Sequence, residues 1–243
     1  MASSMARMAR VAWTIALIVV VQVLVCGLAL APILFAWLPL VRLDAPIGVR
    51  LALAAAAAIP SYVGFALLLM VVSPVASRLT GARTPDAADL RLADLDWPLL
   101  RWVRYLAGIH VVRVFAGTLF RGSPLWTAYL RLNGARIGRR VYINTLAMSD
   151  HNLLEIGDDV VIGDAVHLSG HTVEHGRLRT GRVRIGSNVT IGLGSVVDID
   201  VVIGSGSQIG ALSLVPKHAR LTTPGLYVGI PARPLPPHDP EAS

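Results

Sequence analysis

The most regular feature of the chain is a hydrophobic residue at every sixth position near its C-terminal end. Aliphatic residues hold this position through six consecutive hexads: Ile185, Ile191, Val197, Ile203, Ile209 and Val215. Glycine usually comes next, which suggests a turn with positive φ, and the fifth position holds a small or β-branched residue suited to a tight turn. A period of six predicts a parallel β-helix, in which three short strands form each triangular coil and the aliphatic side chains stack inside it.

The same spacing continues toward the N-terminus in shorter runs. Ile156, Ile162 and Leu168 are six residues apart, and Ile137 and Ile143 form an earlier pair. The step from Leu168 to Ile185 is seventeen residues. We therefore expect a β-helix over residues 135–233, with a non-repeating loop at about Ser169–Arg182 that leaves the prism. Loops on a rigid scaffold are frequent sites of function.

The front of the chain contains two long apolar runs instead. Val11–Val41 and Leu51–Ala76 each exceed the roughly 20 residues that cross a bilayer as a helix. The first run is longer than the apolar region of a signal peptide, and its Ala29–Ala31 stretch precedes Pro32, which disfavours cleavage. We predict that residues 1–80 form two transmembrane helices.

Arginines flank the two apolar runs unequally. Those that precede the first run or follow the second are Arg7, Arg10, Arg78, Arg83 and Arg91. The short connection carries only Arg42 and Arg50, partly offset by Asp44. Because positively charged flanks stay in the cytoplasm, this bias predicts that both termini and the β-helix face the cytoplasm.

Residues 81–134 form a connector of mixed polarity. Thr84–Asp96 is polar, acidic and compatible with a helix. Trp97–Phe120 interleaves aromatic and aliphatic residues with three arginines and His110, which would be costly in a third span. An amphipathic helix in the membrane interface fits this segment better. Pro124–Leu132 is expected to form a second short helix, and the proline-rich tail, 234–243, to be unordered.

The charge of the chain raises the question of nucleic acid. The net charge is +7, and the pI is about 10.5. The basic residues are scattered, with a concentration between Arg78 and Arg140 beside the predicted hairpin, so membrane lipids are the expected partners and no nucleic acid is expected. Cys26, the only cysteine, lies in the first apolar run, which excludes a disulfide or a cysteine nucleophile in the β-helix.

Three histidines fall at or beside the expected loop, namely His167, His171 and His175, with Asp150-His151 roughly one coil earlier. A solvated polar loop would explain them without any chemistry. A zinc site of the γ-carbonic-anhydrase kind is a second possibility, but the spacing does not match, so no metal is expected. We favour His171 as a single general base, because imidazole titrates near neutral pH and can accept a proton from a hydroxyl or an amine.

Several segments resemble the hexapeptide-repeat acyltransferases, such as the galactoside and maltose acetyltransferases. These segments are Gly170-His171, Arg184–Gly192 and Val228–Arg233, and the resemblance covers Ala135–Arg233. It implies a left-handed parallel β-helix and a homotrimer with sites between subunits. It also implies that His171 is the general base and that the backbone N–H of Leu193 stabilises the oxyanion.

The same resemblance assigns the binding residues. It places the acceptor at Asp150, His151, Asn144 and Glu174. It places coenzyme A, or the 4′-phosphopantetheine arm of a carrier protein, at Lys217, Arg233 and Ala211.

A second resemblance includes the two preceding spans. Val141–Asn144, Ser149–Asn152, Ser169–Glu174 and Gly210–His218 are similar to one repeat of the C-terminal membrane region of ε-poly-L-lysine synthetase-like polymerases, which form amide bonds. We therefore expect a membrane-anchored acyltransferase that moves an acyl or aminoacyl group from a pantetheine thioester to an amine or a hydroxyl. The alternative is a non-catalytic trimeric membrane scaffold, since the fold alone does not establish an activity.

Overall fold

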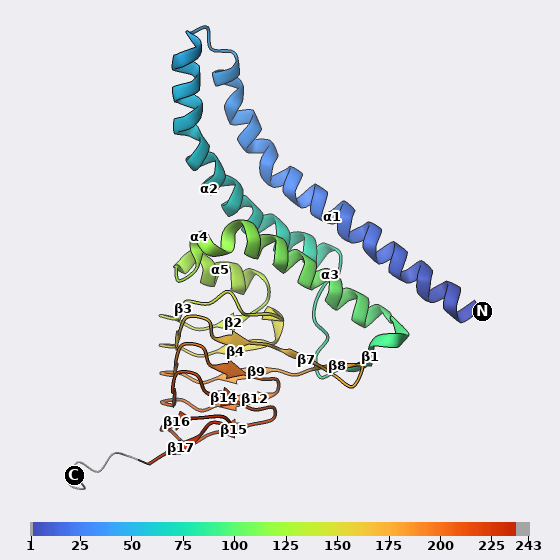
Figure 1. Cartoon of the computed structure of the whole chain (residues 1–243), viewed down its shortest axis with the longest axis vertical. Coiled ribbons are helices and arrows are strands. Elements are labelled where there is room, and N and C mark those ends of the chain that lie inside the picture. Colours follow the sequence, from blue (N-terminus) through green and yellow to red (C-terminus); the bar gives the residue numbers. More distant parts are fainter. Residues whose placement is uncertain (1, 237–243) are drawn as a thin grey trace, which may run out of the picture.

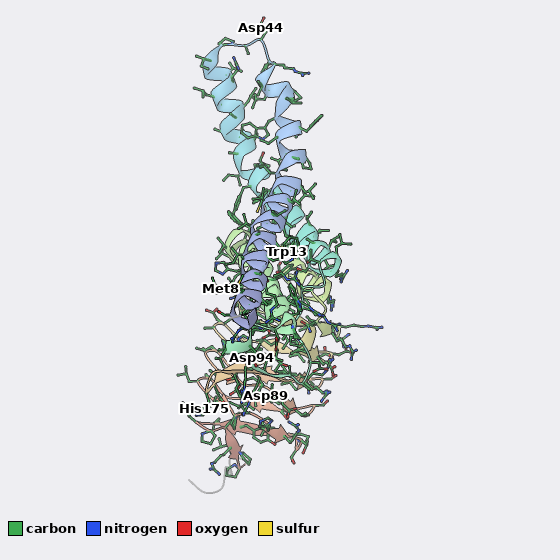
Figure 2. All side chains as sticks on the ribbon, turned by 90° about the vertical axis from the view of Figure 1, so that its right-hand side faces the viewer. Met8, Trp13, Asp44, Asp89, Asp94 and His175 are labelled. Atoms are coloured by element: carbon green, nitrogen blue, oxygen red, sulfur yellow. The ribbon has the colours of Figure 1, made fainter. Side chains whose placement is uncertain are left out.

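A computed structural model describes residues 2–236 of the chain. A long helical hairpin stands above a triangular β-helix, and a layer of shorter helices lies between them (Figure 1). The hairpin consists of α1 (Ala2–Val41) and α2 (Ile47–Leu79). Its tip, marked by Asp44, is the end farthest from the β-helix (Figure 2).

Three helical segments are long and apolar enough to span a membrane. Ser4–Val41 and Ile47–Leu79 have mean hydropathies of 2.8 and 2.1, and Trp97–Phe120 has 1.3. Large side chains such as Val23 and Phe35 are exposed on α1. An exposed apolar surface of this kind is typical of a segment in contact with lipid.

The N-terminal end of α1 lies on the same side of the hairpin as the β-helix (Figure 1). Arg7 donates a hydrogen bond from Nη1 to the carbonyl oxygen of Ala93 at 3.2 Å, and Arg10 donates one from Nη2 to that of Asp94 at 3.1 Å. Both carbonyl groups belong to η1 (Leu92–Asp94). These contacts join the start of α1 to the connector that precedes α3.

The middle layer begins with α3 (Trp97–Val112), which continues through a π-helical turn, η2 (Arg113–Gly117), into α4 (Thr118–Phe120). The buried residues of α3 are Leu99, Leu100, Tyr105, Gly108, Ile109 and Val112. Figure 1 shows α3 between the hairpin and the first coil, so these buried residues pack against protein on one side of the helix. The predicted second helix is present as α5 (Pro124–Leu132), with Ser123 as its N-cap.

The β-helix has three faces of parallel strands. The first face contains β2 (Arg136–Ile137), β4 (Leu154–Ile156), β9 (Val183–Ile185), β12 (Val201–Ile203) and β15 (Arg220–Leu221). The second contains β3 (Tyr142–Ile143), β5 (Val161–Ile162), β10 (Thr190–Ile191), β13 (Gln208–Ile209) and β16 (Leu226–Val228), with β17 (Arg233–Leu235) antiparallel at its edge. The third contains β6 (His167–Leu168), β11 (Val196–Val197) and β14 (Leu214–Val215).

The period-six residues form the core as predicted. In successive coils, Ile185 pairs with Ile203 on the first face, and Ile191 pairs with Ile209 on the second. All six hexad aliphatics are buried. The fifth-position residues are also mostly buried, for example Ser195, so they fill the inside of the corners, where only a small or β-branched side chain fits.

The predicted role of the glycine beside each aliphatic is wrong. The positive φ falls at the fourth position of each hexad, for instance at Asn188 (56°) and Gly194 (66°). A Cβ added at Gly186 or Gly192 would instead lie 2.5 Å from a backbone nitrogen of the next coil. These glycines are needed because successive coils approach each other closely.

Two segments expected to lack strands form a small sheet. Within Ser169–Arg182, β7 (His171–Glu174) and β8 (Arg177–Thr180) make a hairpin that leaves the prism. The connector that looked helix-compatible contains a strand, β1 (Asp89–Arg91), which pairs antiparallel with β8. Arg177 Nε lies 2.6 Å from Asp89 Oδ1 across this pair, a contact between distant residues that no local pattern predicts.

The C-terminal boundary also differs from the expectation. Pro234 and Leu235, expected in the unordered tail, belong to β17 and pair with β16. Residues 237–243 of that tail lie outside the described part of the chain.

Candidate active site

The site is organised around a hydrogen bond between His171 and Asp150. His171 is the first residue of β7, where the chain leaves the third face. Its Nδ1 lies 2.5 Å from Oδ2 of Asp150, which is fully buried, while the His171 side chain is 23% exposed. Its Nε2 makes no hydrogen bond to any of residues 2–236, so this nitrogen is available to a substrate.

Local backbone geometry brings the carboxylate to the histidine. Asp150 has a left-handed φ of 54°, a conformation that is uncommon for a residue with a side chain. The backbone N–H of Gly170 donates to Asp150 Oδ2 at 3.1 Å. A Cβ at position 170 would lie 2.8 Å from the Cβ of Asp150, so only glycine allows this approach.

The Asp150 carboxylate also accepts hydrogen bonds from three further side chains. Thr84 Oγ1 donates to Oδ1 at 2.7 Å, Trp102 Nε1 donates to the same oxygen at 3.1 Å, and Ser149 Oγ donates to Oδ2 at 2.9 Å. Burial by itself would raise the pKa of Asp150, but the hydrogen bonds from His171, Thr84 and Ser149 lower it overall. Asp150 is therefore a buried, ionised carboxylate directed at His171.

Thr84 and Trp102 carry no signal in the sequence that points to this site. Thr84 is buried in the connector, and Trp102 lies on α3 with its ring edge-on to His171, the centroids 5.0 Å apart. Trp102 looked like one of several aromatic residues of an amphipathic helix. Only the packing of α3 on the first coil reveals its contact with Asp150.

An open pocket of about 360 Å³ lies beside His171. One wall comes from α3 and η2 and the other from the first coils; the lining residues are Leu106, Ile109, His110, Arg113, Ala147, Met148, Ser149, His167 and His171. Burial lowers the pKa of His167, and its nearness to His171 and Arg113 lowers it further. Within residues 2–236, no three His, Cys, Asp or Glu side chains gather in a way that could hold a metal.

The structure gives Asp150 and His151 roles other than the predicted contact with the acceptor, because both are buried. His151 packs against the rings of Tyr105 and Tyr129, and Nε2 lies 3.3 Å from the carbonyl oxygen of Met148. Burial lowers the pKa of His151 to about 4, with a smaller effect from Arg113. His151 is thus a neutral core residue at physiological pH. Asn144 follows β3 and does not line the pocket beside His171.

Glu174 and Lys217, predicted to bind the acceptor and the donor, instead contact each other. Glu174 ends β7, Lys217 lies in the turn between β14 and β15, and the two side chains form an ion pair. This pair connects the projecting hairpin with the lower coils. It also offsets the charge of the only lysine in the chain.

Leu193, Ala211 and Arg233 lie away from His171. Leu193 and Ala211 occupy successive turns at the corner between the second and third faces, and Arg233 begins β17. His171 leaves the prism at the other edge of the third face. The Leu193 N–H has no acceptor among the described residues, while its carbonyl oxygen accepts from Leu212 N at 2.9 Å.

This geometry can support proton transfer. An ionised Asp150 holds the proton of His171 on Nδ1, which leaves Nε2 of the neutral imidazole as a proton acceptor. The tautomer is assigned here from the hydrogen-bond partner. A hydroxyl or amine in the pocket would meet this nitrogen.

Parts of this chain are similar in sequence to known proteins. No family model matches the chain. It is 27% identical over 114 residues to the delta-poly-L-ornithine synthetase of Acinetobacter baumannii, which is 47% of this chain and 9% of that protein. It is 42% identical over 89 residues to the galactoside O-acetyltransferase of Escherichia coli, which is 33% of this chain and 44% of that protein. The chain thus matches less than half the length of either relative.

Among solved structures, a hexapeptide-repeat acetyltransferase from Vibrio cholerae, complexed with acetyl coenzyme A, is 30% identical. The match covers 42% of this chain and 59% of that one, with a TM-score of 0.38. The sequence matches confirm the relationship expected from the motifs around His171 and Val228–Arg233. Over the matched segments, this chain is therefore similar to the hexapeptide-repeat acyltransferases.

Proposed function

We propose that this protein is a membrane-anchored acyltransferase that moves an acyl or aminoacyl group from a pantetheine thioester to an amine or a hydroxyl. The observation that carries the proposal is the Asp150–His171 pair beside an accessible pocket. Burying an ionised carboxylate is costly unless it is paired. A scaffold has no need of such a carboxylate directed at a partly exposed histidine, whereas a general base does.

In the proposed reaction, His171 Nε2 takes the proton of the acceptor as its nitrogen or oxygen attacks the thioester carbonyl carbon. The new C–N or C–O bond forms, and the carbonyl oxygen becomes an oxyanion. When the tetrahedral intermediate collapses, the C–S bond breaks and His171 returns the proton to the departing thiolate. Asp150 holds the ring orientation and stabilises the imidazolium that forms in between.

The faces of the prism favour a homotrimer. On the first face, Glu155 lies 3.0 Å from Arg136 and 3.1 Å from Arg184, which makes an outward ladder of charges. The outward residues of the other two faces are mostly uncharged, for example Tyr142, Val161, Thr190, Gln208, Val196 and Leu214. Uncharged faces suit the centre of an interface, and cyclic symmetry would use the second and third faces of every copy.

A trimer of this kind would complete the site. His171 and the Leu193 N–H lie at opposite edges of the third face within one chain. Packing of two copies through these faces can bring His171 of one copy near Leu193 of the next. The unpaired N–H of Leu193 would then donate to the oxyanion.

The donor is an acyl-CoA or an acyl group on a carrier protein. Coenzyme A carries three phosphates, and the lower coils offer few free cations for them. Lys217 pairs with Glu174, and Arg220 Nη2 lies 3.0 Å from Asp200. This shortage supports a carrier-bound pantetheine arm with its single phosphodiester, whereas the acetyl coenzyme A in the Vibrio cholerae structure supports the free coenzyme. The arginine bias around the hairpin supports a cytoplasmic position for either donor.

The test uses the full-length protein in detergent with a panel of acyl and aminoacyl thioesters, on coenzyme A and on a carrier, and a panel of amines and alcohols. Mass spectrometry detects the product. His171→Ala should lower turnover by about 10²–10⁴-fold, because a general base contributes that much. His175→Ala is the matched control, since His175 is exposed at the tip of the same hairpin. A folded His171→Ala protein with normal turnover would refute the proposal.

A further inference from the structure

The pocket beside His171 is lined by basic groups. Four of its side chains are histidine or arginine, namely His110, Arg113, His167 and His171, and no lining residue is Asp or Glu. The carboxylate of Asp150 is buried behind His171 and is already hydrogen-bonded to it, so it does not face the pocket. The guanidinium of Arg113 is the permanent positive charge of this lining, and it attracts an anionic group and repels a purely cationic amine.

Arg113 is the strongest cation in this pocket, and it lacks a counter-ion. It begins the π-helical turn η2, a kind of turn that is common at functional sites. Its Nη2 donates to the carbonyl oxygen of Met148 at 2.8 Å, and its Nε is buried without a partner among the described residues. No Asp or Glu within residues 2–236 forms an ion pair with it. A half-buried guanidinium without a counter-ion is unfavourable, and a bound anion would relieve this.

We propose that Arg113 binds an anionic group of the acceptor, a carboxylate or a phosphate, while the acceptor's amine or hydroxyl reaches His171. This inference rests on the proposed acyl transfer. The planar guanidinium matches either anion. Leu106, Ile109 and Met148 line the same pocket, so methylene groups between the two ends of the acceptor would have apolar contacts. The acceptor class is thus a short chain with a nucleophile at one end and an anion at the other.

The basic lining would also prepare an amine for attack. Nearby positive charges disfavour the protonated form of an amine. The acceptor's anionic end would therefore provide affinity by binding Arg113. The positive charge of Arg113 would also favour the neutral, nucleophilic form of the acceptor's amine. A single arrangement of charges serves both binding and reaction.

The experiment uses the full-length protein in detergent with one thioester donor and matched acceptors. These are ω-amino acids of increasing chain length, their carboxamides, and aminoalkyl phosphates, with hydroxylamine as a small neutral acceptor. The readout is the ratio of kcat/KM for each anionic acceptor to that for its carboxamide. Arg113→Met should reduce this ratio by about 10- to 100-fold, mainly through KM, because a hydrogen bond to a charged group is worth that much.

Two further variants make the result specific. Arg113→Gln removes the charge but keeps a polar side chain at this position, so it should lower the ratio in the same way. Arg101→Met removes an exposed arginine from α3 that does not line this pocket, and it should leave the ratio unchanged. A larger effect with the phosphates or with the amino acids would identify which anion Arg113 binds.

A ratio that Arg113→Met and Arg113→Gln leave unchanged would overturn the inference. So would a wild-type protein that prefers the carboxamides. Failure of the proposed function would look different, because wild-type protein would then transfer nothing to hydroxylamine, or would transfer equally well after His171→Ala.

Discussion

At the residue scale, the two histidines nearest Asp150 differ because their surroundings differ. His171 is partly exposed and hydrogen-bonded to an ionised carboxylate. His151 is buried between Tyr105 and Tyr129, and its pKa falls to about 4. The first is available for proton transfer, whereas the second belongs to the core.

The pKa of His151 makes stability depend on pH. Its folded-state pKa of about 4 lies below the ordinary 6.5, so between these values the unfolded chain binds a proton that the native chain does not. The contribution to stability is therefore complete above pH 6.5 and is lost as the pH falls toward 4. Over this window the loss is roughly 3 kcal/mol.

Urea unfolding of the detergent-solubilised protein at a series of pH values would measure this loss. His151→Gln, which does not titrate, should be less stable at neutral pH but should lack this part of the slope. His175→Ala is a control, because His175 is exposed. An identical slope in wild type and His151→Gln would assign the pH dependence to other groups.

At the element scale, α3 and the connector form part of the site. Trp102 on α3 and Thr84 in the connector both donate to Oδ1 of Asp150. Trp102→Phe retains an aromatic ring beside His171 but removes this donor. We expect kcat to fall by about 10-fold, the effect of losing one hydrogen bond to a charged group, with little change in KM.

Steady-state kinetics with one acceptor would test this role of α3. Trp97→Phe is the matched control, since Trp97 is exposed at the start of the same helix. Thr84→Val should act in the same direction as Trp102→Phe. Unchanged kcat in both would mean that Asp150 does not depend on these donors.

At the scale of the whole molecule, the separation of His171 from Leu193 makes a prediction about assembly. Leu193→Pro removes the N–H proposed to stabilise the oxyanion, and this residue has no positive φ that would forbid proline. His171→Ala and Leu193→Pro homotrimers should each be nearly inactive. In a trimer that contains both variants, one of the three interfaces pairs an intact histidine with an intact N–H.

Co-expression of the two variants with different tags, purification through both tags, and native mass spectrometry would test this arrangement. Activity well above that of either parent is expected. Mixed trimers without any recovered activity would exclude a site shared between subunits in this way, and a purely monomeric, active protein would exclude the trimer itself.

The sequence by itself predicted the parts of this protein that depend on local repetition. The period-six aliphatics became the stacked core, because neighbouring coils place equivalent residues directly above one another. The long apolar runs became the two helices of the hairpin. His171 was predicted as the general base from its place beside the interruption of the repeat, and the structure shows that it begins the projecting hairpin there.

Only the tertiary structure decided how the site is held together. The contacts of Asp150 with Thr84 and Trp102, the pairing of β1 with β8, and the ion pair between Glu174 and Lys217 all join residues that are distant in the sequence. Periodicity reports which face of an element is buried, but not which distant side chain meets it. The role of Gly186 was likewise hidden, because it depends on the distance between adjacent coils.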